Sequence, residues 1–147
     1  MNGLTLAQAN KIADAALAKG RETKLAPLTV VVLDAGGHIV VAKREDNSGI
    51  LRIEIAMGKA WGALGMGFGS RNLAGRAAKM PAFFTALAAA SQGRVVPVPG
   101  GVLIRNGSGA IAGAVGISGD TSDNDELCCI AGIEASGLTA DPGTAPA

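Results

Sequence analysis

The apolar residues near the start of the chain recur at helical spacing. Ala9 and Ile12 belong to a stripe with intervals of three or four residues, which is the repeat of an amphipathic helix. Thr5 and Gln8 form a capping-box pattern in front of this stripe, and Gly20 follows it as a stop signal. The pattern predicts one amphipathic helix between Thr5 and Gly20.

Two pairs of apolar, β-branched runs predict hairpins. The first pair covers about 28–34 and 38–43 and is joined by "DAGG", whose glycines supply the positive φ angles of a tight turn. The second pair covers 101–105 and 110–118 and is joined at "NG". Pro97 and Pro99 exclude a regular central strand just before it, although an edge strand could begin at Arg94.

Further helices lie between and after the hairpins. Apolar residues at spacings of three and four predict a helix at about 50–66, followed by "GMGFGSRNLAG" as a loop. The segment "PAFFTALAAAS" opens with a proline, which suits the first turn of a short helix. A last helix is predicted from near Ser122 to Gly137.

The order helix, hairpin, helices, hairpin, helix predicts the fold class. Strands that come in hairpin pairs favour an antiparallel sheet flanked by helices, which is an α+β fold. A length of 147 residues suits one domain, which we assign to residues 1–138. Residues 139–147 are rich in small residues and proline and are expected to form a flexible tail.

The composition suggests that copies of the chain associate. Hydrophobic residues make up 48% and charged residues 17% of the chain, so some apolar surface needs cover. We expect a homo-oligomer whose interface uses the strand at 110–118 and the helix with Phe83 and Phe84. A net charge of +1 and few aromatic residues argue against nucleic acid as a partner. No apolar run is long enough to span a membrane, and a cytoplasmic location is expected.

An acidic burst and two cysteines open the last predicted helix. Ser122, Asp123, Asp125 and Glu126 would lie in its first turn, where such side chains cap free N–H groups and complement the helix dipole. The spacing of these acids does not fit a calcium loop, and no metal site is predicted. The adjacent cysteines, 128 and 129, are poorly placed to bond to each other and are expected to be free and buried.

Four cations are candidates for binding an anion. Arg52 and Lys59 lie two turns apart on one side of a predicted helix, and neither has an acid three or four residues away. Arg44 ends the first hairpin and Arg71 lies in the following loop. Together these side chains could converge on a carboxylate or a phosphate.

The same cations also have an ordinary interpretation. They could form a solvated face, or they could pair with Asp46 or Glu126 across the fold. The sequence leaves both interpretations open.

His38 is the only histidine of the chain and directly follows the "DAGG" turn. A single histidine excludes a metal site with two histidines and a haem with two histidine ligands. The residue suits an exposed strand start, but a lone imidazole could also act as a general base or as one axial ligand of haem. The methionines are further candidates for soft-metal ligation.

Several motifs together resemble one family. The segments "VVVLDAGGHIVVAKRED", "KAWGA", "VPGGVLI" and "AIAGAVGISGDTSDNDELCCIAGI" are similar, in this order, to the GlcG/HbpS family, which is related to the C-terminal part of PduO. The resemblance covers about residues 4–138. It implies a profilin-like sandwich with an antiparallel sheet of about five strands between helices, and it implies homo-oligomers.

The resemblance also implies candidate residues. Arg44 and Asp46 match the family's R-x-D segment, Lys59 matches its K-A lysine, and Asp125 and Glu126 match its D-E pair. Some members of the family bind haem, so haem is the candidate cofactor. This sequence departs from the family pattern at Glu45 and the residues next to it, where the corner becomes more polar.

Two functions follow as hypotheses. The leading one is a small-molecule-binding domain whose ligand is anionic, with haem or a related tetrapyrrole as the first candidate and Arg44, Arg52, Lys59 and His38 as binding residues. The alternative is an enzyme that acts on a small carboxylate or carbonyl compound by proton transfer, isomerisation or hydrolysis in a catabolic pathway. In that case Lys59 and Arg44 would hold the anion while Asp46 or Glu126 moved a proton.

Overall fold

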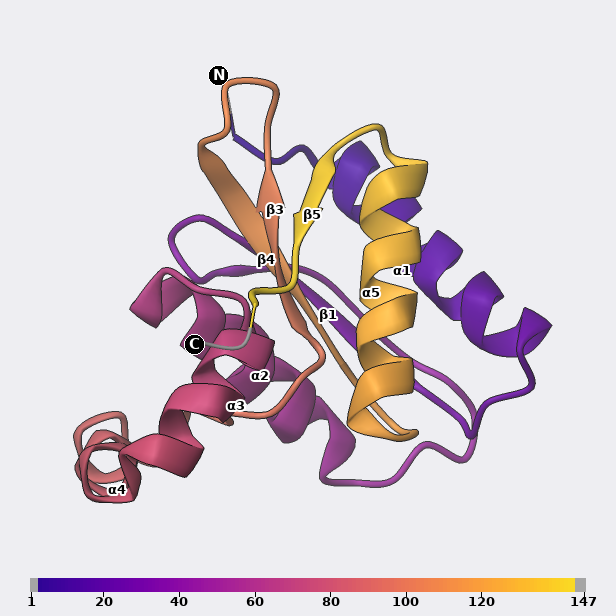
Figure 1. Cartoon of the computed structure of the whole chain (residues 1–147). Helices are drawn as coiled ribbons and strands as arrows, with labels where there is room; N and C mark the ends of the chain where they lie inside the picture. Colours follow the sequence, from indigo (N-terminus) through magenta and orange to yellow (C-terminus); the bar gives the residue numbers. More distant parts are fainter. Residues whose placement is uncertain (1–2, 145–147) are drawn as a thin grey trace.

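The computed structural model describes residues 3–144 and contains five helices and five strands in this part of the chain (Figure 1). Their order confirms the predicted alternation of helices and hairpins. The elements are α1 (Leu6–Glu22), β1 (Thr29–Asp34), β2 (Ile39–Arg44), α2 (Arg52–Met66), α3 (Ser70–Lys79), α4 (Pro81–Ala90), β3 (Gly101–Arg105), β4 (Ile111–Ser118), α5 (Ser122–Ala135) and β5 (Thr139–Asp141).

The five strands form one antiparallel sheet in the order β2-β1-β4-β3-β5. This sheet confirms the predicted α+β class. The longest strand, β4, lies in the middle of the sheet, and every residue after Ile111 is buried. The expectation that the strand at 110–118 forms an interface between copies is therefore wrong, because the chain's own helices and neighbouring strands already cover it.

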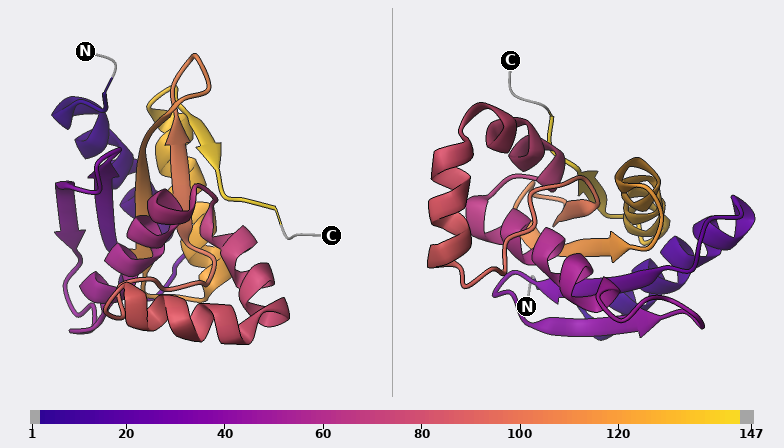
Figure 2. Two further views of the ribbon diagram at one scale, coloured as in Figure 1. Left: turned by 90° about the vertical axis from the view of Figure 1, so that its left-hand side faces the viewer. Right: turned by 90° about the horizontal axis from the view of Figure 1, so that it is seen from below.

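Helices cover both faces of the sheet (Figures 1 and 2). On one face α1 and α5 pack together, and buried residues such as Ile12, Val30 and Ile133 join them to the sheet in one core cluster. On the other face α2 packs with Val31 and Leu33 in a second cluster. Both cysteines are free and buried within the first cluster, as predicted.

Three local predictions are corrected. The segment predicted as a loop contains α3, whose only large apolar side chain, Leu73, is fully buried, so its helical repeat was too sparse to read from sequence. Residues 139–141 form β5 on β3 instead of belonging to a tail, and Asp141 pairs with Arg105 at 2.8 Å. No strand begins at Arg94, and residues 94–100 are irregular.

Helix α2 lies unusually close to the sheet at Gly116 of β4. A Cβ atom at this position would overlap the carbonyl oxygen of Ala56 in the helix backbone. Glycine is required here because the obstacle is backbone, which cannot rotate out of the way as a side chain can. The glycine-punctuated sequence of β4 is thus explained by the packing of a helix on a strand.

We predict that Gly116→Ala lowers the free energy of unfolding by about 1–3 kcal/mol, because overpacking forces the α2 and β4 backbones apart. Gly107→Ala, in the β3–β4 turn, is the control, since nothing lies within 4 Å of its Cβ position. It should change stability by less than about 0.5 kcal/mol. Chemical denaturation of both variants measures the difference, and equal midpoints would refute the close approach.

Candidate functional site

Lys59 forms a buried ion pair with Asp125. Its Nζ donates to Asp125 Oδ2 at 3.1 Å and to the carbonyl oxygen of Ile117 at 2.9 Å, and the two side chains are 3% and 1% exposed. Asp125 Oδ1 accepts the N–H of Asp120 at 3.0 Å. The partner of Lys59 is therefore Asp125, and the expected pairing with Asp46 or Glu126 is corrected.

The electrostatics of this pair are set by burial. Burial raises the pKa of Asp125, and the neighbouring Lys59 and the N–H of Asp120 oppose this rise only in part. A solute cannot reach the Lys59 ammonium without opening the buried layer between α2, the end of β4 and α5. The pair therefore links α2 to α5 inside the protein.

The other acids of the cluster pair with Arg71. Its Nε donates to Glu126 Oε2 at 2.9 Å, and its Nη2 bonds to Asp123. Hydrogen bonds to Glu126, and then to Asp123, raise the pKa of Arg71. The helix cap itself is Thr121, which accepts the N–H of Asn124 at 3.2 Å. Asp123 and Asp125 thus lie in the first turn of α5, as predicted, and the acids of this cluster also form ion pairs with α2 and α3.

His38 lies at the β1–β2 turn with its side chain 80% exposed. Its Nδ1 is 3.1 Å from Asp34 Oδ1, and that oxygen also accepts the backbone N–H groups of Gly36 and His38. These hydrogen bonds, led by the N–H of His38, lower the pKa of Asp34. An imidazole held through Nδ1 keeps Nε2 free, which is the arrangement found in metal-ligating histidines.

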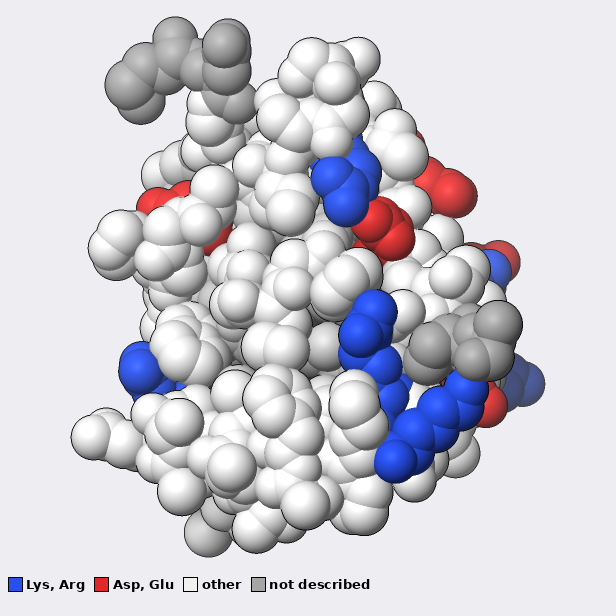
Figure 3. All heavy atoms as spheres, turned by 60° about the vertical axis from the view of Figure 1, so that its left-hand side comes forward, with Lys and Arg blue, Asp and Glu red and all other residues white. Residues whose placement is uncertain are grey.

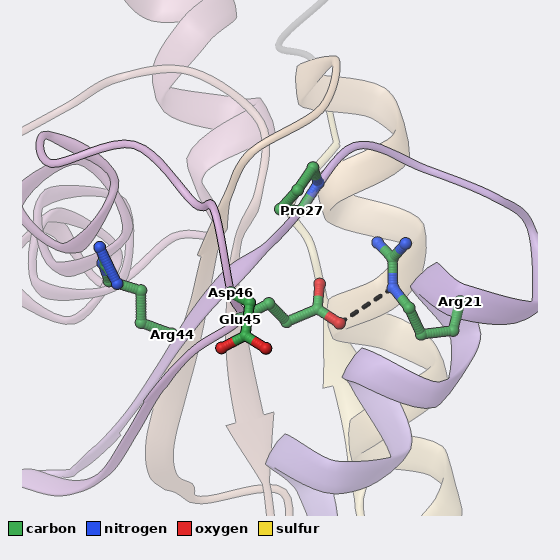
Figure 4. A pocket seen from close by; sticks show the side chains of 5 residues that line it. All are labelled: Arg21, Pro27, Arg44, Glu45 and Asp46. Carbon is green, nitrogen blue, oxygen red and sulfur yellow. Dashed lines mark ion pairs between the residues drawn. The ribbon is translucent and has the colours of Figure 1, made fainter.

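Arg44 and Asp46 line an open hollow of about 420 Å³ with Arg21, Pro27 and Glu45 (Figure 4). Glu45 points across the hollow to Arg21, whose Nε is 2.9 Å from Glu45 Oε2. Figure 4 shows the Arg44 side chain extending in the opposite direction, away from Arg21. Neither Lys59 nor Glu126 lines this hollow, so the three residues suggested for catalysis do not share it.

Arg52 opens α2 at the end of β4. Its Nη1 donates to Ser118 Oγ at 3.1 Å, next to the strand residue whose carbonyl binds Lys59. The two cations of the predicted ridge thus reach consecutive residues of β4. Lys59 is buried in an ion pair. Arg52 is half-buried and has no acidic partner within the described residues.

An apolar trough around Trp61 was missed from sequence. It consists of three hollows of about 450, 220 and 200 Å³ that adjoin because they share residues: Trp61 and Gly65 line two of them, and Leu87 and Val95 line two. We call these hollows the Trp61 trough. Its surroundings carry few charges on the face drawn in Figure 3, where uncharged residues predominate.

One cation stands at the Trp61 trough. The guanidinium of Arg94 stacks on the Trp61 ring at 4.0 Å from the centroid, and Arg94 Nε donates to the carbonyl oxygen of Ser91 at 3.2 Å. Gly62 of α2 allows Val95 to fold back over the helix, since a Cβ there would lie 3.0 Å from the Val95 side chain. The "GKAWG" spacing of glycines was the one sequence signal for this close approach.

Residues 3–144 contain neither a metal-binding cluster nor a membrane-spanning helix. No group of three or more histidine, cysteine or acidic side chains could hold a metal ion there. None of the helices in this part is long and apolar enough to cross a membrane.

Comparison with known proteins identifies the class to which this fold and its surfaces belong. A family model described as "Haem degrading protein HbpS-like" matches residues 4–134. The chain therefore belongs to the HbpS-like family, as its sequence motifs had indicated. A curated relative from Citrobacter freundii, an uncharacterised 15.0 kDa protein of the dhaT-dhaS intergenic region, is 34% identical over 125 residues, which are 84% of this chain and 85% of the relative.

Solved structures share the fold along nearly the whole chain. A PduOC:heme complex matches with a TM-score of 0.83 and 26% identity over 98% of this chain and 99% of that chain. The ORFY protein of Klebsiella pneumoniae matches at 0.82 and 27% over 93% and 92%. A variant of HbpS from Streptomyces reticuli matches at 0.78 and 27% over 91% and 87%.

We predict that Lys59→Met lowers the free energy of unfolding by about 3–5 kcal/mol, because it leaves the Asp125 carboxylate buried without its partner. The control is Lys43→Met, which removes the exposed pair with Asp14 and should cost less than about 1 kcal/mol. Adding Asp125→Asn to Lys59→Met should recover part of the loss. Urea denaturation measures all three, and equal costs for the two lysines would contradict a buried pair.

Proposed function

We propose that the chain binds haem or a related tetrapyrrole, a planar apolar ligand with anionic carboxylates. The observation that carries this proposal is the match, along 98% of the chain, to a relative whose solved structure is a haem complex. Fold similarity alone does not transfer a function, so the residues of this chain must suit the ligand.

The Trp61 trough meets the first two requirements of such a ligand. Its lining is largely apolar, and the Trp61 ring, one face of which Arg94 covers, adds flat aromatic surface to it. Arg94 supplies a cation on that ring, placed to hold a ligand carboxylate by charge-assisted hydrogen bonds. When bound, haem would add an iron centre to this otherwise apolar surface.

His38 is our candidate for the third requirement, an axial donor, and it lies next to the residues that line the trough. Gly36 and Gly37 of its turn line the trough together with Trp61, and the His38 ring lies beside Gly36. Asp34 holds Nδ1, so Nε2 is the nitrogen available to iron. A single exposed histidine favours weak and reversible binding, because no second histidine can complete a strong pair.

The enzyme alternative has less support. It needs Lys59, Glu126 and Asp46 at one substrate, but Lys59 and Glu126 are engaged in separate ion pairs and Asp46 lines a different hollow. The enzymatic function stays a prediction, because its three proposed residues do not line one hollow.

We predict that haem titration of the purified protein gives a Soret band that Arg94→Gln and His38→Ala alter in different ways. Arg94→Gln should weaken binding about tenfold, since a hydrogen bond to a charged group is lost. His38→Ala should shift the Soret maximum, and added imidazole should restore it. Absorption spectroscopy measures both effects.

Arg76→Gln is the matched control for Arg94→Gln. Arg76 also stacks on an aromatic ring, that of Phe68 at 4.5 Å, but Phe68 does not line the trough, whereas Trp61, on which Arg94 stacks, does. It should leave haem affinity unchanged. Equal losses in both arginine variants, or a Soret band unaffected by His38→Ala, would count against this site.

We also propose that the chain is a homo-oligomer that uses the α4 side of the molecule. Met80 and Phe83 are 43% and 49% exposed there, and such side chains gain from contact with a second copy. We predict that light scattering finds a species larger than 14.5 kDa and that Phe83→Asp makes it smaller. Ile50→Asp, at an 86% exposed position before α2, is the control. A monomer at micromolar concentration would refute the proposal.

A further inference from the structure

Two arginines differ from the others that the structure describes. Three arginines pair with carboxylates and two stack on aromatic rings; these are Arg21, Arg71, Arg105, Arg76 and Arg94. Arg44 and Arg52 do neither, and the only hydrogen bond of their guanidinium groups is the one from Arg52 to Ser118. Among the arginines of residues 3–144, these two alone have neither a carboxylate partner nor an aromatic ring to stack on.

The register of the sheet brings these arginines to one place. Arg44 of β2 is opposite Thr29 of β1, and Thr29 is opposite Ser118 of β4. Residues directly opposite each other share a face, so the three side chains form a row across one end of the sheet. Thr29 lies on the same face as Val31, which packs on α2, the helix that carries Arg52.

The distances suit a small ligand. Two strand spacings separate Arg44 from Ser118, roughly 10 Å, and the Arg52 guanidinium already reaches Ser118 from the other side. Arg44 and the Arg52 guanidinium thus lie at the two ends of one row of residues across the sheet. Between them lie buried hydroxyl groups: Thr29 and Ser48 bond to each other at 2.7 Å and form a polar floor.

We propose that Arg44 and Arg52 bind a small oxyanion, a carboxylate or a phosphate, above the hydroxyl groups of Thr29 and Ser118. Arginine is suited to this task because its planar fork binds such groups with two hydrogen bonds. Arg52 opens helix α2, whose N-cap residue Leu51 makes no side-chain cap, so the positive end of the helix dipole also favours an anion there. The site is separate from the Trp61 trough and does not depend on haem binding.

Two acids near the site lower the affinity that we expect for an anion. Asp46 and Glu54 lie close in sequence to Arg44 and Arg52, are exposed, and form ion pairs with neither. Exposed carboxylates weaken anion binding by repulsion that salt screens. The site should therefore bind a free anion modestly, and removal of the Glu54 charge should strengthen binding.

Inorganic phosphate, acetate and malonate serve as probes of the wild-type chain. Binding is followed by ¹⁵N–¹H NMR of the arginine Nε–H groups and the first amides of α2. We expect saturable shifts at these groups with at least one probe, and sodium chloride at equal ionic strength should not produce them. Phosphate shifts without malonate shifts would assign a phosphate ligand, and the reverse would assign a carboxylate. No saturable shift with any probe would overturn the proposal.

Charge-matched variants separate the site from general electrostatics. Arg44→Gln and Arg52→Gln should each weaken binding about tenfold while the melting temperature without anion stays within a few degrees, since neither arginine has an ion pair to lose. Arg105→Gln removes the same charge on the opposite side of the sheet and should leave binding unchanged. Glu54→Gln should tighten it. Equal losses in all three arginine variants would overturn the proposal. An unchanged haem Soret band in Arg44→Gln would show that the anion site is distinct from the Trp61 trough.

Discussion

The buried pair of Lys59 and Asp125 fixes how the two helical layers of this fold meet. Lys59 extends from α2 on one face of the sheet, passes the carbonyl of Ile117 at the end of β4, and reaches α5 on the other face. Two charges inside a protein are tolerated only when their hydrogen bonds are satisfied, and no buried side-chain polar atom of the described residues lacks a partner. The pair therefore allows one relative placement of α2 and α5 and penalises others.

The ion pair depends on close packing between the backbones of α2 and β4. Lys59 reaches across the sheet only because α2 lies near enough to β4 for Gly116 to face the carbonyl of Ala56. The same helix uses Gly62 to admit Val95, which lines the Trp61 trough. A side chain at Gly116 would push the α2 backbone away from β4 and disturb the ion pair, whereas one at Gly62 would displace Val95 and disturb the trough.

Local patterns predicted most of the fold and little of the site. Both hairpins, the helices α1, α2, α4 and α5 and the α+β class followed from periodicity and turn residues, which act over a few positions. Helix α3 was missed because Leu73 is its one buried large apolar residue, and β5 because its three residues gain their structure from β3. The partner of Lys59 could not be predicted from the sequence for a related reason. Asp125 lies 66 positions away, and two other acids suited the same role.

The geometry of α2 explains why the two proposed binding surfaces lie apart. Arg52 and Trp61 are nine residues apart, which in a helix is about 14 Å along the axis and two and a half turns around it. The two side chains therefore leave the helix on opposite sides, one toward the polar end of β4 and the other toward α4. Lys59 lies between them and is buried, so it cannot serve a ligand at either end. A residue that resembles a binding lysine in the sequence instead holds the helix that carries both surfaces.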